Sequence, residues 1–399
     1  MDDSLGIVLQ FNKSIQACLM TDSEIDPTND RYRAGNLIIR RATHADDGVL
    51  QQILRNNPMQ GWIQLALERS PSYFAGEDLF GRSRAVIGQD TAKGGAVIGM
   101  YHNRFMPVFV NGTVVQAGYL GELRINPTYR NRIRIFKHGF AAMRPLNRPE
   151  SDTTQIWFTS IASDNHRARR LLESQHRDLP RYTPVGELQT LAISTRKGRR
   201  PELLRQATPG DISMICNFYN AQAARYQFAP HLTPDWLSGP SAAKGLGIED
   251  FWLYEVQHRL LACVAIWDQR SFKQAVVKGY RFPLNRLRPL YNLTARLLGK
   301  PLLPMVNTRL ESVYLALFTY APQAETAVQR ILQEALHLAA RKNADTGLLG
   351  LSSAHPLLPA IRASLHPTSY QTCIESVTWG EEQSPYLDDG IVQPEIAIL

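Results

Sequence analysis

Two similar segments, which begin 165 residues apart, constrain the fold of this chain more than any other feature of its sequence. They are IIRRATHAD (38–46) and LLRQATPGD (203–211). Each predicts a short apolar strand ending in Ala-Thr, where the Thr can cap a helix and an Asp three residues later stands near the position of a capping-box acid. A repeat at this spacing favours two domains of one fold, as does a length of 399 residues. Chance is the alternative, because such helix starts are common.

The order of the later elements supports the repeat. Apolar patterns in the first half predict a run of strands, a helix, a strand, a second helix and closing strands, and the same order returns between residues 251 and 379. This order predicts an α+β fold with a mixed sheet in each half. The chain is therefore divided into an N-terminal extension (1–35), two domains (36–198 and 202–379), an insertion without a counterpart (271–305) and a C-terminal tail (380–399).

The positive charge of the chain is concentrated in one segment. The net charge is +8, and residues 100–200 hold 17 Lys and Arg against 7 Asp and Glu, whereas the rest of the chain is close to balance. Such a local field favours an anionic ligand over general binding of nucleic acid. Aromatic residues are not interleaved with the basic block as a stacking platform requires, so no nucleic-acid partner is expected.

The segment INPTYRNRIRIFKHGF (125–140) lies in this basic region and predicts the end of a strand, a turn and the start of a helix. Its first helical turns are crowded with basic residues, although the N-terminus of a helix already carries partial positive charge. A bound anion would explain the crowding, because free backbone amides at a helix start form an anion site. The alternative is a helix face that is simply solvated.

Three segments of the first half together resemble the GNAT superfamily of N-acetyltransferases. They are IIRRATHADD, YLGELRINPTYRNRIRIFKHGF and TSIASDNHRARRLLES. With the repeated order of elements, the resemblance covers most of residues 36–379 and indicates two GNAT-like folds in tandem. It implies transfer of an acetyl group from acetyl-CoA, or of another acyl group from its acyl-CoA, to a primary amine of a small molecule or peptide. No metal is implied.

The resemblance also implies a cofactor site. In this family, a strand that splays from its neighbour binds the pantetheine, and the turn that follows binds the pyrophosphate. The matching positions are Leu123, Arg124 and Ile125 on the strand, Arg130, Asn131, Arg132, Ile133, Arg134 and Ile135 in the turn, and Asn165 at the later helix start.

Glu122 is the carboxylate nearest to that strand segment and is the candidate general base for the amine. The alternative is that its side chain points away from the cleft, because side chains alternate between the two faces of a strand.

Departures from the family pattern favour a second hypothesis. Ile133 and Ile135 stand where the family has small residues, and branched side chains restrict the approach of the backbone to a phosphate. Leu172 stands where the family often has a Tyr that protonates the leaving thiolate. The second half has no basic helix start and is expected to be non-catalytic. The alternative function is an inactive protein that binds CoA, another anionic ligand or a protein partner.

The insertion is basic and contains a helical apolar stripe. Residues 269–310 hold nine Lys and Arg and no Asp or Glu. A basic amphipathic helix can lie on a membrane surface. We expect instead that the stripe is buried between the two domains or across a homodimer, since such stripes usually pack into a core. The stripe consists of Leu287, Leu290, Tyr291, Thr294, Leu297 and Leu298, with Arg288 and Arg296 outside it.

Cysteine usage and hydropathy indicate the compartment. The four cysteines are far apart and form no Cys-x-x-Cys pair, which is typical of reduced thiols rather than of disulfides or a zinc site. No apolar run approaches the ~20 residues that span a bilayer, and the first twenty residues do not resemble a secretory signal. A cytoplasmic protein without a transmembrane segment is expected.

Overall fold

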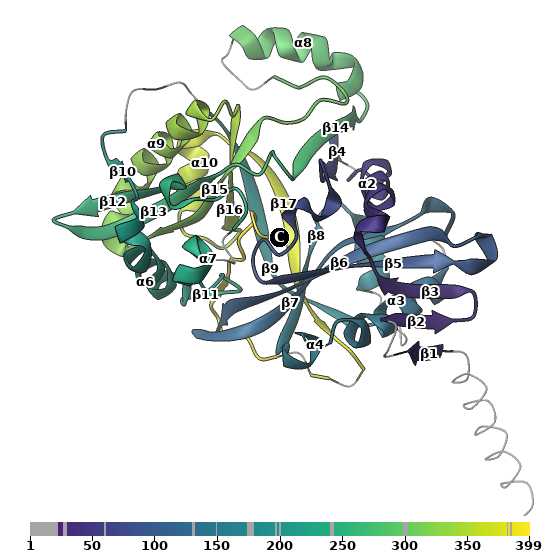
Figure 1. Cartoon of the computed structure of the whole chain (residues 1–399). Coiled ribbons are helices and arrows are strands. Elements are labelled where there is room, and N and C mark those ends of the chain that lie inside the picture. The colour runs from purple at the N-terminus through teal and green to yellow at the C-terminus, as the bar shows by residue number, and fades with distance from the viewer. Residues whose placement is uncertain are drawn as a thin grey trace, which may run out of the picture.

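Figure 1 shows the computed structural model of the chain. The structure describes residues 23–26, 30–59, 61–129, 132–148, 150–173, 179–195, 198, 201–239, 243–297, 302–380, 382–383 and 385–399. Of the residues singled out above, Arg130, Asn131, Leu298 and most of the N-terminal extension lie outside these ranges. No helix within them is both long and apolar enough to cross a membrane.

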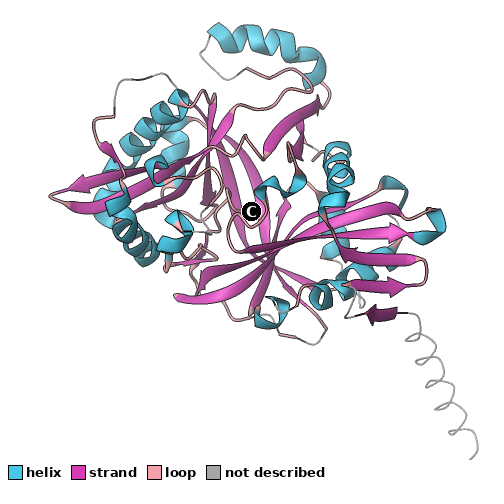
Figure 2. Cartoon of the chain, in the orientation of Figure 1, coloured by secondary structure: helices cyan, strands magenta, loops and turns pink. Residues whose placement is uncertain are grey.

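Strands of both halves form one mixed sheet, which confirms the α+β prediction. The described residues place fourteen strands in the order β1-β2-β3-β5-β6-β7-β8-β17-β9-β16-β15-β13-β12-β10. In Figure 2 the strands run through the middle of the molecule and helices cover both ends. The sheet strands are β1 (Ser23–Asp26), β2 (Arg31–Ala34), β3 (Leu37–Arg41), β5 (Arg82–Asp90), β6 (Ala96–Val110), β7 (Thr113–Ile125), β8 (Ile156–Ala162), β9 (Arg181–Ser194), β10 (Leu204–Gln206), β12 (Phe251–Val256), β13 (Arg259–Trp267), β15 (Ser312–Tyr320), β16 (Thr346–Ser352) and β17 (Thr368–Thr378).

The helices and two short ribbons complete the architecture. One ribbon pairs β4 (Ile63–Glu68) with β14 (Gln274–Tyr280), and the other pairs β11 (Tyr226–Gln227) with β18 (Ile391–Val392). The helices are α2 (Asp47–Asn56), α3 (Ile133–Leu146), α4 (Glu150–Thr153), α5 (His166–Leu172), α6 (Ile212–Ala223), α7 (Pro234–Ser238), α8 (Leu284–Leu297), α9 (Val328–Arg341) and α10 (Leu358–Leu365).

The repeated segments fold alike. In the first, the Asp46 carboxylate accepts a hydrogen bond from the Thr43 amide at 2.8 Å and both terminal nitrogens of Arg40 at 2.8 Å. In the second, Asp211 accepts from the Thr208 amide at 2.8 Å, and it also receives two bonds from Arg205, the counterpart of Arg40. The Arg six residues before each Asp locks the capping acid in place, and this explains why the two segments share their Arg as well as Thr and Asp.

The two halves exchange their last strands. β9 belongs to the first half of the chain but pairs with β16 of the second, over Leu188–Ser194 and Thr346–Ser352. In return β17, near the end of the second half, pairs with β8 of the first. β9 and β17 also pair with each other and so join the halves into one sheet. The sequence boundaries 36–198 and 202–379 therefore remain a prediction about the repeat, because the sheet is continuous across them.

The largest hydrophobic core is shared between the halves. It contains residues of β6, β7 and β8 together with residues of α6, β13 and the C-terminal tail. At its centre the Phe158 ring stacks on Phe228 of the second half, with centroids 4.5 Å apart and planes 2° from parallel. Trp236 of α7 donates its indole N–H to the main-chain oxygen of Leu79 at 3.0 Å. The two halves therefore bury much of their apolar surface against each other.

Candidate functional site

The strands β7 and β8 separate along their length. Their parallel ladder joins Ala117–Leu120 to Ile156–Thr159 and ends there, while β7 continues to Ile125 along β6. At the end of the ladder the Thr159 hydroxyl donates to the main-chain oxygen of Leu120 at 2.7 Å. The predicted positions Leu123, Arg124 and Ile125 all lie on the part of β7 beyond the point of separation.

A β-bulge at Glu122 lies where the separation begins. The pairing with β6 shifts register there, so that Met100 faces Arg124 and His102 faces Gly121. Two residues of β7 therefore oppose one residue of β6, and Glu122 takes a positive φ of 53°. A positive φ is strained for a residue with a side chain and persists only where its surroundings hold it.

Glu122 is held by two partners from the loop that follows β4. Arg69 donates its Nε and Nη2 to Glu122 Oε1 at 3.1 and 2.8 Å, and the Tyr73 hydroxyl donates to Oε2 at 2.7 Å. Burial alone would raise the pKa of Glu122, but the charge of Arg69, with His102 and the Tyr73 hydrogen bond, lowers that pKa to about 2. A carboxylate so paired is a weak proton acceptor at neutral pH, and these contacts fit a residue that holds the bulge in place.

Two arginines supply buried positive charge near Glu122. Arg69 and Arg104 are buried, and the electrostatics of Lys273 are linked to those of Arg69, Arg104 and Glu122. His102 is buried as well, but burial and the charge of Arg69 lower its pKa well below the usual value, so its imidazole is neutral at neutral pH. Among the described residues, His102 Nε2 and Arg104 Nη1 have no hydrogen-bond partner. This excess of buried positive charge favours a negative group next to the bulge.

Lys273 differs from its neighbours because it titrates near neutral pH. Burial, and then the charges of Arg104 and Arg69, lower the pKa of Lys273 to about 7. Its Nζ donates to the main-chain oxygen of Leu399 at 3.0 Å. An amine with such a pKa is partly neutral at physiological pH and can accept a proton. Sequence reasoning missed this residue, since nothing in the pattern around Lys273 links it to Glu122 or Arg104, which lie far earlier in the chain.

The turn after β7 is held by polar contacts and leads into the basic helix start. Tyr129 is buried and donates its hydroxyl to Asp90 Oδ2 at 3.0 Å, and the Asn126 side chain accepts from the Thr128 amide at 3.1 Å. The Arg132 guanidinium lies 5.0 Å from the centre of the Tyr129 ring. These contacts hold the described part of the turn, from Asn126 to Tyr129.

The start of α3 presents two exposed arginines. Arg132 is the N-cap residue, makes no side-chain capping bond and is exposed, as is Arg134. The Arg134 side chain donates its Nε to His138 Nε2 at 3.4 Å, one turn further along the helix. The two isoleucines differ: Ile133 is 39% exposed, whereas Ile135 packs on the small core of Ile98, Ile125 and Tyr129. Only Ile133 therefore adds a branched side chain to the exposed surface of the turn.

Asn165 and Leu172 have structural contacts. The Asn165 side chain caps α5 by accepting from the Ala168 amide at 3.2 Å. Leu172 is buried in the core beneath α3 and does not bring a polar group to the separated strands. A hydroxyl pair does lie at the point of separation, where Tyr119 of β7 contacts Ser160 of β8 at 2.7 Å.

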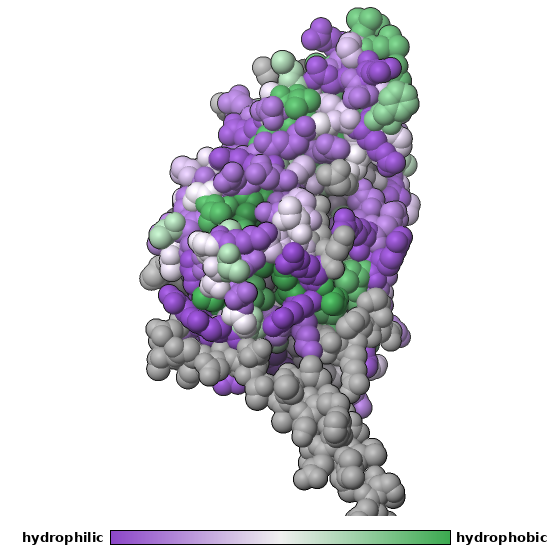
Figure 3. Space-filling model, turned by 90° about the vertical axis from the view of Figure 1, so that its right-hand side faces the viewer, coloured by the Kyte–Doolittle hydropathy of each residue, from purple (hydrophilic) through white to green (hydrophobic). Residues whose placement is uncertain are grey.

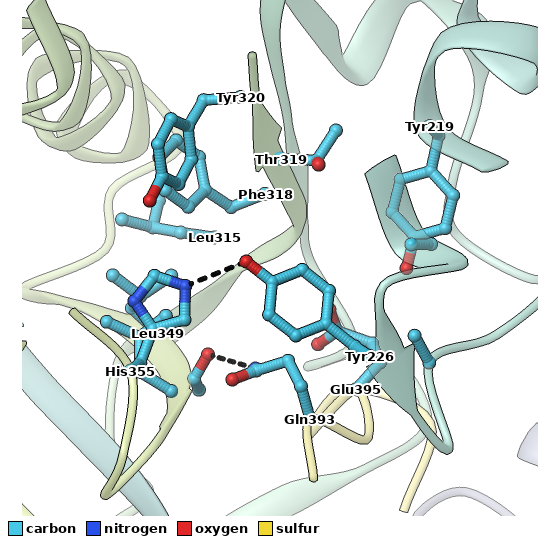
Figure 4. A pocket seen from close by; sticks show the side chains of 14 residues that line it. Tyr219, Tyr226, Leu315, Phe318, Thr319, Tyr320, Leu349, His355, Gln393 and Glu395 are labelled. Atoms are coloured by element: carbon cyan, nitrogen blue, oxygen red, sulfur yellow. Dashed lines mark hydrogen bonds between the residues drawn. The ribbon is translucent and has the colours of Figure 1, made fainter. Parts of the chain in front are cut away.

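The second half repeats the separation but fills it with the C-terminal tail. β15 and β16 pair over Ser312–Tyr314 and then part, and Leu317 takes the positive φ, 53°, that Glu122 takes in β7. Glu395 accepts from the Leu317 amide at 2.7 Å, and Gln393 bonds to the Ser352 amide and the Gly350 oxygen at 2.7 and 3.0 Å. A pocket remains next to these contacts, and Figure 4 shows the Gln393 and Glu395 side chains beside its aromatic residues.

In the described parts of the chain, no three His, Cys, Asp or Glu side chains are grouped so that they could bind a metal ion. The two separated strand pairs differ. The C-terminal tail occupies the separation of β15 from β16, whereas a basic helix start lies beside the separation of β7 from β8. The described geometry therefore marks the β7–β8 separation as the candidate cofactor site.

Comparison with known proteins identifies the fold. No protein-family model matches the chain, and no curated protein sequence matches it. Among solved structures, the chain is similar to N-myristoyltransferase of Saccharomyces cerevisiae with bound myristoyl-CoA, at 9% identity and a TM-score of 0.57, over 93% of this chain and 86% of that one. It is also similar to a GCN5-related N-acetyltransferase from Sphaerobacter thermophilus, at 11% identity and a TM-score of 0.52, over 90% and 99% of the two chains. The chain therefore has the GNAT fold of these N-acyltransferases, in a tandem arrangement.

Proposed function

We propose that the protein is an acyl-CoA-dependent N-acyltransferase, with acetyl-CoA as the first candidate donor and a primary amine of a small molecule or peptide as acceptor. The observation that carries the proposal is the separation of β7 from β8 at the Glu122 bulge, beside the uncapped basic start of α3. The yeast enzyme with a similar fold binds myristoyl-CoA, which supports an acyl-CoA site and keeps longer acyl chains open. A cytoplasmic location fits such a donor.

In this reaction the amine nitrogen attacks the thioester carbonyl, an amide C–N bond forms, and the C–S bond breaks to release CoA. Main-chain amides of Leu123 and Arg124, beyond the bulge, would stabilise the oxyanion, and the start of α3 with Arg132 and Arg134 would bind the phosphates. The buried cations near Glu122 would stabilise negative charge as it develops.

The proton of the attacking amine needs an acceptor. Glu122 is the candidate from the sequence, but its low pKa and its two partners favour a role in positioning the bulge. Lys273 is the better candidate, since its pKa of about 7 suits a general base. Leu172 and the exposed Ile133 favour the alternative, an inactive protein that binds CoA. The second experiment below distinguishes this alternative from an active acyltransferase.

Arg132→Ala should weaken the binding of CoA and acetyl-CoA by about tenfold, since a hydrogen bond to a charged phosphate contributes about 1.5–3 kcal/mol. Isothermal titration calorimetry measures the change. Arg148→Ala is the matched control, because Arg148 is an exposed Arg just after the other end of α3 that pairs with Asp152. Equal affinities of Arg132→Ala and wild type, or no heat from wild type with acetyl-, longer acyl- or free CoA, would refute the phosphate site.

The rate of acyl transfer should rise with pH through about 7, because the neutral, proton-accepting form of Lys273 gains population above its pKa. Lys273→Met should remove this limb and lower kcat while CoA affinity stays within about twofold. Release of free thiol from acetyl-CoA in the presence of a panel of amines gives the rate. A pH limb that persists in Lys273→Met would exclude Lys273 as the base, and no turnover with CoA bound would favour the inactive alternative.

A further inference from the structure

Helix α8 stands on an arm that leaves the body of the protein. The arm begins with β14, which pairs with β4, and it returns through residues 302–310, where Arg309 bridges to Val276. In Figure 1, α8 lies at the outer end of this arm, beyond the β4–β14 ribbon and away from the main sheet. The helix is therefore anchored to the protein through one side.

The side of α8 that faces the returning chain is polar. Asn292 donates to the Leu303 oxygen at 3.0 Å and accepts from its amide at 2.8 Å, and Arg288 donates to the Pro304 oxygen at 2.6 Å. Ala295, on the same side, is 2% exposed and is the buried residue of the helix. Hydrogen bonds, and not a hydrophobic core, attach this helix to the arm.

The apolar stripe of α8 faces away from the protein. Leu287, Leu290 and Leu297 of the stripe are 49%, 60% and 82% exposed. Leu293, next to the stripe, is 59% exposed as well. The prediction gave two alternatives, burial between the two domains or across a homodimer. The first is wrong for Leu290 and Leu297, and the second stays a prediction. An amphipathic pattern fixes which residues share a face but does not determine which face meets the protein.

Other apolar side chains extend the exposed stripe. Phe282 before the helix and Met305 after it are both 67% exposed, and Val306 is 47% exposed. Hydrophobic side chains gather at the upper end of the molecule in Figure 3, where α8 lies, and hydrophilic ones border them. An apolar patch of this kind on a monomer marks an interaction surface.

The charge around the patch limits what can cover it. Arg281, Arg286 and Arg296 are exposed beside the leucines, and residues 269–310 contain no acidic residue. In a symmetric dimer the same patch of two copies would meet and bring these arginines together. An anionic lipid surface instead complements the arginines and accepts leucines that project from a convex helix.

We propose that α8 and the segment 302–306 bind the surface of an anionic membrane, with Leu290, Leu293 and Leu297 inserted between the lipids and the arginines at the head groups. The arm would then attach the protein to the membrane without spanning it. The proposal does not depend on acyl transfer, since it rests on the exposure and charge of the arm alone.

Co-sedimentation of the full chain with vesicles tests the proposal. The protein should sediment with vesicles of phosphatidylcholine and phosphatidylserine, and raised salt or vesicles of phosphatidylcholine alone should reduce the bound fraction. A triple variant, Leu290→Ser, Leu293→Ser and Leu297→Ser, should lose binding by at least about tenfold. Val256→Ser, at an exposed valine elsewhere (41%), should bind as wild type does.

Two outcomes would overturn the proposal. One is a wild-type protein that stays in the supernatant with anionic vesicles, or a triple variant that binds them as wild type does. The other is a wild-type dimer in size-exclusion chromatography with light scattering that the triple substitution converts to a monomer, because a second copy would then cover the patch. Thermal unfolding of each variant confirms that it is folded, as expected for substitutions at exposed positions.

Discussion

Glu122→Gln should lower the free energy of unfolding by roughly 3–5 kcal/mol, because the substitution leaves the buried charge of Arg69 without its partner. Arg69 is 8% exposed, and its Nη2 lies 2.8 Å from Glu122 Oε1. The neutral amide can still accept a hydrogen bond but cannot offset the positive charges of Arg69, Arg104 and Lys273. Glu77 also interacts electrostatically with Arg69, but its effect on the pKa of Arg69 is smaller than that of Glu122, whose carboxylate oxygen accepts a hydrogen bond from Arg69.

Urea unfolding at neutral pH measures this effect. Asp152→Asn is the matched control, since Asp152 pairs with Arg148 on the surface, where the two side chains are 59% and 68% exposed and such a pair contributes little. The double variant Glu122→Gln, Arg69→Met should recover part of the lost stability, because it removes the unpaired charge. A loss below about 1 kcal/mol in Glu122→Gln would show that the pair is solvated and does not hold the bulge.

The same pair should make stability depend on pH in the acid range. The pKa of Glu122 is lowered from 4.5 to about 2 in the folded protein, so its contribution is complete above the unfolded value of about 4.5 and is lost as the pH falls toward 2. In Glu122→Gln this part of the acid dependence should be absent. Comparing the pH dependence of stability in wild type and in Glu122→Gln therefore separates the contribution of the Glu122–Arg69 pair from that of the other carboxylates.

Local features of the fold could be predicted from the sequence. The Thr43–Asp46 and Thr208–Asp211 caps depend on residues within one turn, and the strands at 96–110 and 113–125 follow from apolar runs around an Asn-Gly turn. The separation of β7 from its neighbour came from the resemblance to a known family, because no residue pattern marks the end of a ladder between two strands.

The exchange of β9 and β17 could not be predicted. Both strands have patterns that suit a position beside either half, and the choice depends on which neighbour buries them better in the complete fold. The same limit applies to Glu122: its partners Arg69 and Tyr73 lie about 50 residues earlier, and the bulge that turns its side chain toward them interrupts the alternation of the strand. For α8, the spacing of apolar residues predicted which residues share one face of the helix, but it did not predict whether that face packs on the protein or faces the solvent.

Phe158→Ala should lower the free energy of unfolding by about 3–5 kcal/mol, the usual loss for a large aromatic side chain removed from a core. Phe158 is fully buried, and its ring stacks on Phe228 across the two halves, so the cavity would open where they meet. Phe158 also lies on the part of β8 that pairs with β7, opposite Tyr119. Loss of its packing should therefore loosen the end of the ladder as well as the core.

Chemical unfolding and hydrogen exchange together test this prediction. Phe282→Ala makes the same change at a ring that is 67% exposed, and it should alter stability by less than about 0.5 kcal/mol. In Phe158→Ala, amides of both β8 and the Phe228 segment should exchange faster, because one core serves both halves. Faster exchange confined to the first half would mean that the halves are stable independently and that the strand exchange, rather than the shared core, joins them.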